Sequence, residues 1–276
     1  MRTNSLIDLH THTVFSDGEY SPEELIDLAK ASGVGFLSIT DHDTLAGYFC
    51  GREKANNAGI KLLPGVEFSS NFDKELHILG YNFDPKHVKL NAELARLEHD
   101  RTERFREMIA RLRKMGINIE PESGKPGTLG RMHIARALVR RGVVGSIDEA
   151  FGKYLDRGKP VYVEGRKLSC REIIELIVSA GGIAVLAHPK SLEMQDVEFN
   201  HLLRALVGYG LKGLEVYYPT HTLADVDHFK RICIRYGLVA TAGTDYHGPS
   251  RDTEALGGTS RDYNPSDSER IALGLI

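Results

Sequence analysis

The sequence predicts an α/β fold built from repeated βα units, and three features of the chain point to it. Seven short apolar segments of strand length are spread along the chain. Stretches whose apolar residues recur at helical spacing alternate with them. Gly, Pro and Asp residues mark several of the borders, as they do in turns. The 276 residues suit one large domain, or one domain that carries an insertion, with a core that needs no disulfide.

The predicted strands are short apolar runs, and several of them end in turns that contain Gly, Pro or Asp. Strands joined by helical connections of this kind form a parallel sheet. In chain order the seven predicted strands are Leu6–His12, Gly35–Thr40, Lys61–Glu67, Glu75–Tyr81, Gly182–Ala187, Lys212–Tyr217 and Gly237–Ala242.

The helices between these strands carry recognisable start and stop signals. Ser21-Pro22-Glu23-Glu24 combines an N-cap, a first-turn proline and a capping-box glutamate. Ser169 and Glu172 repeat the capping-box pattern, and a further helix is predicted over Leu223–Tyr236. Glycines follow the expected ends of the three helices, at Gly33, Gly181 and Gly237.

The connection between the fourth and fifth predicted strands is too long for a simple crossover. It consists mainly of helical patterns over Lys89–Met115, Arg131–Arg141 and Ser146–Tyr154, with a Gly/Pro-rich connection at Pro121–Gly130. We therefore predict a barrel-like domain of residues 1–83 and 169–276, which holds the functional site. Residues 84–168 are predicted to form a helical insertion, or cap, that contributes substrate contacts.

Composition excludes several classes of protein. A net charge of −3 argues against bulk binding to duplex nucleic acid, although it allows a local basic pocket. The chain has neither a membrane-length apolar run nor a signal-peptide pattern, and no obligate protein partner is evident. The three cysteines, Cys50, Cys170 and Cys233, are too far apart in the sequence to suggest a disulfide framework or a thiolate zinc site. We therefore expect a reducing, cytoplasmic location.

Histidines and carboxylates recur at the ends of the predicted strands. His10 and His12 are two residues apart in a strand, so their side chains point to the same face, about 7 Å apart along the strand. Two such imidazoles can bind one metal ion, whereas a solvent-exposed polar strand end is the alternative. The other candidates are Asp17, His42, Glu67, His77, His188, Asp245 and His247.

In a parallel barrel-like sheet the carboxyl ends of all strands meet on one face, which would bring these side chains together. His77 is earlier in its strand, but its side chain could reach the same mouth. Buried carboxylates need a partner, and two or three divalent cations would provide it; a buried His/Asp hydrogen-bond network is the alternative. Imidazole and carboxylate ligands suit Mn, Zn or Fe, and Glu67 could bridge two ions.

Together these motifs resemble those of the PHP (polymerase and histidinol phosphatase) superfamily. The similarity extends over nearly the whole chain and rests on Asp8-Leu9-His10-Thr11-His12, Ser16-Asp17-Gly18, Thr40-Asp41-His42-Asp43, Gly65-Val66-Glu67, Ala187-His188-Pro189 and Thr244-Asp245-Tyr246-His247. The segment Gly130–Leu138 is similar to the TrpH-like branch, whose members act on nucleotides or short oligoribonucleotides.

The resemblance implies a distorted (β/α)₇ TIM-like barrel, the PHP fold, with a two- or three-metal centre. One ion would take His10, His12, Glu67 and Asp245, a second Glu67, His77 and His188, and a third Asp17, His42 and His247. The implied enzyme is a phosphoesterase in which a metal-bridged hydroxide attacks phosphorus. Its substrate would be a small phosphorylated nucleotide or short RNA, as in an AMP or 3′,5′-bisphosphonucleotide phosphatase or a 5′–3′ exoribonuclease.

Basic side chains of the insertion are the candidates for substrate binding. Arg101 and Arg104 lie on one face of the long helix, near its apolar stripe, and would contact a substrate phosphate or a structural carboxylate such as Glu98. Arg131 and His133 belong to the branch-like motif. The remaining candidates for substrate binding are Lys159 and His221. The alternatives are that Lys159 belongs to a solvated turn with Arg157 and that His221 is a surface histidine.

Two other activities remain open from the sequence. Barrel amidohydrolases, which cleave C–N bonds, also begin with His-x-His, but they commonly use a carboxylated lysine where this chain offers Glu67. Within the phosphoesterases, a histidinol-phosphate-type phosphatase would use the same metal chemistry. The arginines of the insertion favour phosphate over an amide.

Overall fold

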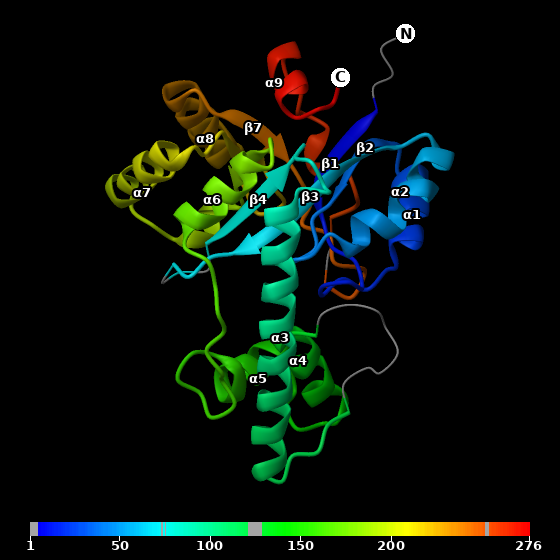
Figure 1. Cartoon of the computed structure of the whole chain (residues 1–276), viewed down its shortest axis with the longest axis vertical. Coiled ribbons are helices and arrows are strands. Elements are labelled where there is room, and N and C mark those ends of the chain that lie inside the picture. Colours follow the sequence, from blue (N-terminus) through cyan, green and yellow to red (C-terminus); the bar gives the residue numbers. More distant parts are fainter. Residues whose placement is uncertain (1–4, 73, 75, 121–128, 252–253) are drawn as a thin grey trace.

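The computed structural model describes residues 5–72, 74, 76–120, 129–251 and 254–276. Seven strands form one sheet in the order β1-β2-β3-β4-β5-β6-β7, with helices around it (Figure 1). The predicted α/β fold is thus confirmed, and each strand lies within two residues of its predicted place. The strands are β1 (Leu6–Thr11), β2 (Val34–Ile39), β3 (Lys61–Ser69), β4 (His77–Tyr81), β5 (Ile183–Leu186), β6 (Gly213–Tyr217) and β7 (Val239–Ala242).

Strand β4 runs antiparallel to both of its neighbours, so the prediction of a wholly parallel sheet is wrong at this strand. The other neighbouring pairs are parallel. A parallel crossover needs a dozen or more residues, and the segment 70–76 between β3 and β4 is too short for one. The reversal pairs His77, the first residue of β4, with Ser69, the last of β3. The predicted strand start, Glu75, lies outside the described residues.

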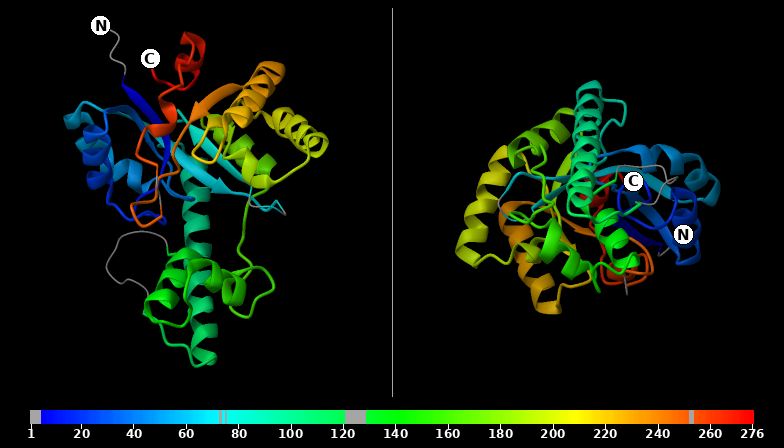
Figure 2. Two further views of the ribbon diagram at one scale, coloured as in Figure 1. Left: turned by 180° about the vertical axis from the view of Figure 1, so that it is seen from behind. Right: turned by 90° about the horizontal axis from the view of Figure 1, so that it is seen from below.

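The sheet is curled, and its first and last strands approach each other. The His12 N–H donates a hydrogen bond of 2.8 Å to the Tyr246 carbonyl, and the Tyr246 N–H donates one of 3.3 Å to the His10 carbonyl. Helices pack around the outside of the sheet (Figure 2), which confirms the distorted TIM-like barrel. These helices are α1 (Pro22–Ala31), α2 (Ala46–Ala58), α6 (Cys170–Ser179), α7 (Asp196–Tyr209) and α8 (Leu223–Tyr236).

The predicted helix signals act as expected. Ser21 and Ser169 each accept a hydrogen bond from the backbone N–H three residues later, and both capping boxes are complete. Gly33, Gly181 and Gly237 have φ values of 80°, 81° and 64°, a left-handed conformation that favours glycine and ends the helix. The local sequence therefore determines where these three helices begin or end.

The long connection between β4 and β5 is helical, as predicted, and carries a hydrophobic core of its own. It contains α3 (Val88–Lys114), α4 (Arg131–Arg140), α5 (Ile147–Ala150) and the π-helix η1 (Phe151–Leu155). The upper part of α3 packs on the sheet through Leu90, Leu94 and Leu97. Its lower part joins α4 and η1 in a separate cluster that includes Phe105, Met108, Leu112, Ile134, Leu138 and Leu155.

Most of the predicted Pro121–Gly130 connection lies outside the described residues. Among the helices that are described, α3 is the longest, yet none combines the length and apolarity needed to cross a membrane. Cys50, Cys170 and Cys233 are free thiols.

The last segment of the chain closes the end of the sheet opposite to α4 and α5 (Figure 1). It contains η3 (Gly258–Ser260) and α9 (Asp267–Ala272). Leu273 and Tyr263 are buried in one cluster with Ile7 of β1. The Tyr263 hydroxyl donates a hydrogen bond of 2.7 Å to the Ala240 carbonyl. Residues 257–276, for which the sequence alone indicates no role, therefore complete the core.

We expect Leu273→Ala to lower the free energy of unfolding by about 2–5 kcal/mol, the usual cost of truncating a buried leucine. Leu273 is 0% exposed, whereas Ile271 in the same segment is 63% exposed. Ile271→Ala is thus the matched control and should change stability by less than about 0.5 kcal/mol. Urea unfolding followed by circular dichroism measures both. Equal effects of the two substitutions would contradict the closing role of this segment.

Candidate metal centre

The predicted histidines and carboxylates meet at one mouth of the sheet, around the carboxylate of Glu67. Glu67 lies on β3 and is 1% exposed. Its carboxylate oxygens are 2.9–3.4 Å from the nearest ring nitrogens of five histidines. These are His10 at 3.4 Å, His12 at 3.2 Å, His42 at 3.1 Å, His77 at 2.9 Å and His188 at 3.2 Å.

The first group of converging side chains consists of His10, His12, Glu67 and Asp245. One ligand atom from each lies within 4.8 Å of all the others. Asp245 Oδ1 is 3.3 Å from His10 Nε2 and 3.1 Å from His12 Nε2. The structure thus brings together the four residues that the resemblance assigns to one ion.

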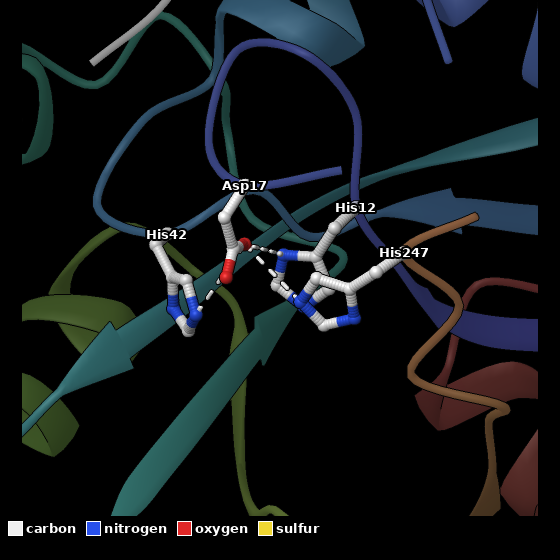
Figure 3. A group of neighbouring side chains, drawn as sticks. All are labelled: His12, Asp17, His42 and His247. Atoms are coloured by element: carbon white, nitrogen blue, oxygen red, sulfur yellow. Dashed lines mark ion pairs between the residues drawn. The ribbon is translucent and has the colours of Figure 1, made fainter. Parts of the chain in front are cut away.

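The second group consists of His12, Asp17, His42 and His247 (Figure 3). The Asp17 carboxylate lies between His42 on one side and the rings of His12 and His247 on the other. Asp17 Oδ1 is 3.1 Å from His247 Nε2 and 3.8 Å from His42 Nε2. The predicted trio of Asp17, His42 and His247 is therefore assembled, and His12 joins it.

The third group contains His42, Glu67 and His77. The resemblance implies His77 and His188 beside Glu67, and both are present, because each has one nitrogen within hydrogen-bond distance of Glu67 Oε1. His188 falls outside the three compact groups formed by the described residues, and its Nδ1 contacts Ser191 Oγ at 2.9 Å. In the third group His42 takes the place beside Glu67 and His77 that the resemblance gives to His188.

Several ligand atoms at this mouth are buried without a hydrogen-bond partner in the described part of the chain: His10 Nε2, His12 Nε2, His42 Nδ1 and Asp17 Oδ1. A buried polar atom that stays unsatisfied is costly. The opposite ring nitrogens of His10 and His12 do have contacts, with Glu215 at 2.9 Å and Ser16 at 3.2 Å. The free nitrogens and the mixed imidazole–carboxylate set fit divalent cations.

The electrostatics also suit cation binding. Burial alone would raise the pKa of Glu67, but His77, His42 and His10 hold it well below its usual value. Burial likewise opposes ionisation of Asp245, and His10 and His247 again lower its pKa well below the usual range. Burial lowers the pKa of His42 far below its ordinary value. Burial also opposes protonation of His10, but the surrounding carboxylates, Glu215 first among them, raise its pKa well above the ordinary value. Ionised carboxylates attract a cation, and a cation that binds His10 displaces its proton, because only the deprotonated ring nitrogen is a ligand.

Two buried carboxylates behind the histidines were missed by the sequence analysis. Glu215 on β6 is 0% exposed and contacts His10 Nδ1. Asp41 accepts hydrogen bonds of 2.7 Å from the Thr13 N–H and the Ser16 hydroxyl. The sequence did contain a signal for Glu215, which is a carboxylate within an apolar strand and so needs a partner. Glu67 was predicted as a ligand on that same ground.

A cavity of about 190 Å³ connects the mouth with the helical insertion. Asp17, His42 and His77 line it. Four of the six predicted substrate-binding residues line it as well: Arg101, Arg104, Arg131 and His133. Three basic residues that the sequence analysis did not select also line it: Arg166, Lys167 and Arg251.

The arginines of α3 occupy different surroundings in this cavity. Arg101 forms an ion pair with Asp43, so its carboxylate partner is Asp43 rather than Glu98. Arg104 Nε is buried and has no hydrogen-bond partner among the described residues. Burial, together with the charges of Arg101 and Arg131, lowers the pKa of Arg104 to about 10. Such a concentration of positive charge attracts an anion.

The other two predicted substrate-binding residues do not line this cavity. Lys159 is exposed on the turn after η1. His221 follows β6, and its Nδ1 is 2.8 Å from the Val216 carbonyl, while its ring packs against Tyr218 and Phe229. The structure thus brings four of the six candidates together and leaves these two apart.

Comparison with known proteins identifies the family. The PHP domain family matches residues 8–156. The chain is 36% identical over 259 residues to a 3′,5′-nucleoside bisphosphate phosphatase of Chromobacterium violaceum, covering 92% of this chain and 91% of the relative. It is also 36% identical over 246 residues to a 5′–3′ exoribonuclease of Haemophilus influenzae, covering 88% and 90%.

A solved structure agrees with these relatives. It comes from Bifidobacterium adolescentis, is provisionally named a metal-dependent phosphoesterase, and superimposes with a TM-score of 0.81 at 28% identity. The match covers 98% of this chain and 96% of the other. The chain therefore belongs to the PHP domain family.

Proposed function

We propose that this protein is a metal-dependent phosphoesterase that hydrolyses a phosphate ester of a nucleotide or a short oligoribonucleotide. One observation carries the proposal: a single cavity is lined both by candidate metal ligands and by arginines. Metal ions and arginines are the two kinds of group that stabilise charge on a phosphoryl group.

Two or three divalent ions would occupy the centre, drawn from Mn, Zn and Fe. The proposed ligands of the first ion are His10, His12, Glu67 and Asp245, which the compact group supports. Glu67 also serves a second ion together with His77 and His188. Asp17, His42 and His247 serve a third, and His12 borders that group.

When bound, such ions supply a nucleophile by lowering the pKa of a coordinated water, and they neutralise charge on the phosphoryl oxygens. The chain's own residues then orient the ester. Arg104 and Arg131 grip the non-reacting oxygens of the phosphate through charge-assisted hydrogen bonds. Asp43 holds the guanidinium of Arg101 beside them.

Residues 84–168 act in this proposal as a helical insertion on a barrel of residues 1–83 and 169–276. Its separate hydrophobic cluster supports that division. Arg101, Arg104, Arg131 and His133 all belong to the insertion and all line the cavity. The insertion would thus select the substrate, and the barrel would hold the metal ions.

The nucleotide part of the proposal rests on the relatives. One is named a nucleoside bisphosphate phosphatase and another a 5′–3′ exoribonuclease, and both are similar to this chain over nearly its whole length. The substrate would be a small phosphorylated molecule rather than bulk duplex, because a net charge of −3 argues against bulk binding to the nucleic-acid backbone.

A screen of ester hydrolysis tests this activity. With Mn²⁺ present, we expect release of phosphate from AMP or a 3′,5′-bisphosphonucleotide, or release of nucleoside monophosphate from a short 5′-phosphorylated RNA, and no release of phosphate from histidinol phosphate. Ester and amide substrates are compared in parallel. Preferential cleavage of amides, or release of neither phosphate nor nucleotide by a fully metal-loaded protein, would overturn the proposal.

Removal of the metal tests the centre directly. We expect a chelator to abolish hydrolysis and Mn²⁺ to restore it. A metal present at about 100 times its dissociation constant adds about 2.7 kcal/mol of stability, which thermal unfolding detects. His12→Ala should lose most of this metal-dependent stabilisation. His201→Ala, at an exposed histidine of α7, is the control and should keep it. Equal responses of the two variants would argue against a centre at His12.

The role of Arg104 is tested by Arg104→Met, which keeps much of the length and removes the charge. Loss of a charge-assisted hydrogen bond worth about 1.5–3 kcal/mol lowers kcat/KM by about 10- to 100-fold. The control is Arg106→Met on the same helix, because Arg106 is 70% exposed and pairs with Glu103. Steady-state kinetics with the best substrate of the screen measures both. Unchanged kinetics in Arg104→Met would remove this residue from the binding site.

A further inference from the structure

Glu215 is a fully buried carboxylate that contacts two candidate metal ligands at once. Its Oε1 is 2.9 Å from His10 Nδ1, and its Oε2 accepts a hydrogen bond of 2.7 Å from the backbone N–H of His188. Glu215 lies on β6 with 0% exposure. Its two oxygens thus contact His10 on β1 and His188 just after β5.

We propose that Glu215 is a positioning residue that fixes the tautomer of His10 and anchors the backbone of His188, so that both imidazoles present Nε2 to Glu67. This inference rests on the proposed metal centre. It adds a residue that contacts no substrate and that orients two ligands jointly.

The effect on His10 follows from the chemistry of imidazole. A neutral ring carries one N–H, and a carboxylate beside Nδ1 keeps the proton on that nitrogen. The lone pair is then on Nε2, which lies 3.4 Å from Glu67 Oε1 and 3.3 Å from Asp245 Oδ1. A carboxylate behind a metal-binding histidine orients the ring and raises its basicity.

The effect on His188 is on the backbone. His188 has φ 26° and ψ 60°, which lies in the left-handed region that non-glycine residues rarely adopt. Such a conformation persists where surrounding contacts hold it. The hydrogen bond to Glu215 is one such contact, and Ser191 beside Nδ1 is another. His188 Nε2 is left facing Glu67 at 3.2 Å.

The neighbouring backbone is shaped to accept this arrangement. A Cβ atom at Gly243, just after β7, would lie 2.3 Å from His10 Cβ and 2.8 Å from Glu215 Oε1. Atoms cannot approach that closely, so any larger residue would displace the pair. Glycine at this position therefore allows the contact between His10 and Glu215.

Glu215→Gln separates this role from simple packing. Glutamine has nearly the same size, but it offers one acceptor oxygen where glutamate offers two. If the oxygen stays with the His188 N–H, the amide NH₂ faces His10 Nδ1 and drives the proton to Nε2. A protonated Nε2 cannot bind a metal ion.

The experiment compares wild-type protein, Glu215→Gln and the control Glu175→Gln. Glu175 carries the same functional group in an exposed ion pair with Arg171. Zn²⁺ affinities are measured by competition with a chromophoric chelator, and ring tautomers by NMR of ¹⁵N-histidine in the Zn²⁺-loaded proteins. We expect about a 10- to 100-fold loss of affinity in Glu215→Gln. The ion held by Asp17, His42 and His247 should be retained, and Glu175→Gln should match the wild type.

The spectrum is the signature that a purely structural role would not produce. In wild-type protein, His10 should bind Zn²⁺ through Nε2 and carry its proton on Nδ1; this signal is readable even if Glu215→Gln does not fold. Binding through Nδ1, unchanged affinity in a folded Glu215→Gln, or equal weakening of every ion together with lower stability of the metal-free protein would each overturn the inference. Release of phosphate or nucleotide by the wild type separately tests the proposed function.

Discussion

The buried carboxylate of Glu67 is the interaction on which the rest of the site depends. An ionised carboxylate that is 1% exposed would be costly without compensating charge. Five imidazoles provide part of that compensation, from 2.9 to 3.4 Å away. These side chains can meet only when strands β1, β3, β4 and β5 adopt this one arrangement. The arrangement of these strands and the geometry of the candidate centre therefore depend on each other.

The reversal of β4 shows how topology serves this requirement. A parallel β4 would present His77 at the far edge of the sheet, because His77 is the first residue of the strand. The short connection after β3 forces the antiparallel direction, and the start of β4 then lies beside the end of β3. The long connection that follows leaves room for the helical insertion. The short connection before β4 thus places His77 beside Glu67. The long connection after β4 contains the helical insertion that carries the arginines.

The sequence predicts most of the centre because alternation along strands is a local property. His10, His12 and Glu67 are at strand ends and could be assigned to one face without knowledge of the fold. Features that depend on contacts between segments far apart in the sequence could not be predicted in this way. Asp43 as the partner of Arg101 and the burial of Leu273 under the sheet are examples. Lys159 and His221 lie in loops and do not line the cavity. The positions of these loops also depend on contacts between distant segments, so the sequence could not predict them.

Helix α3 fixes the position of two cavity arginines relative to the sheet. Its first half packs on the sheet through Leu94 and Leu97, and its second half packs in the insertion through Phe105 and Met108. Arg101 and Arg104 lie at the transition between these two cores and line the cavity from there. A continuous helix is stiff, so it cannot change the position of its arginines without disturbing one core or the other. The spacing between these arginines and the candidate metal ligands is therefore maintained by hydrophobic packing on both sides.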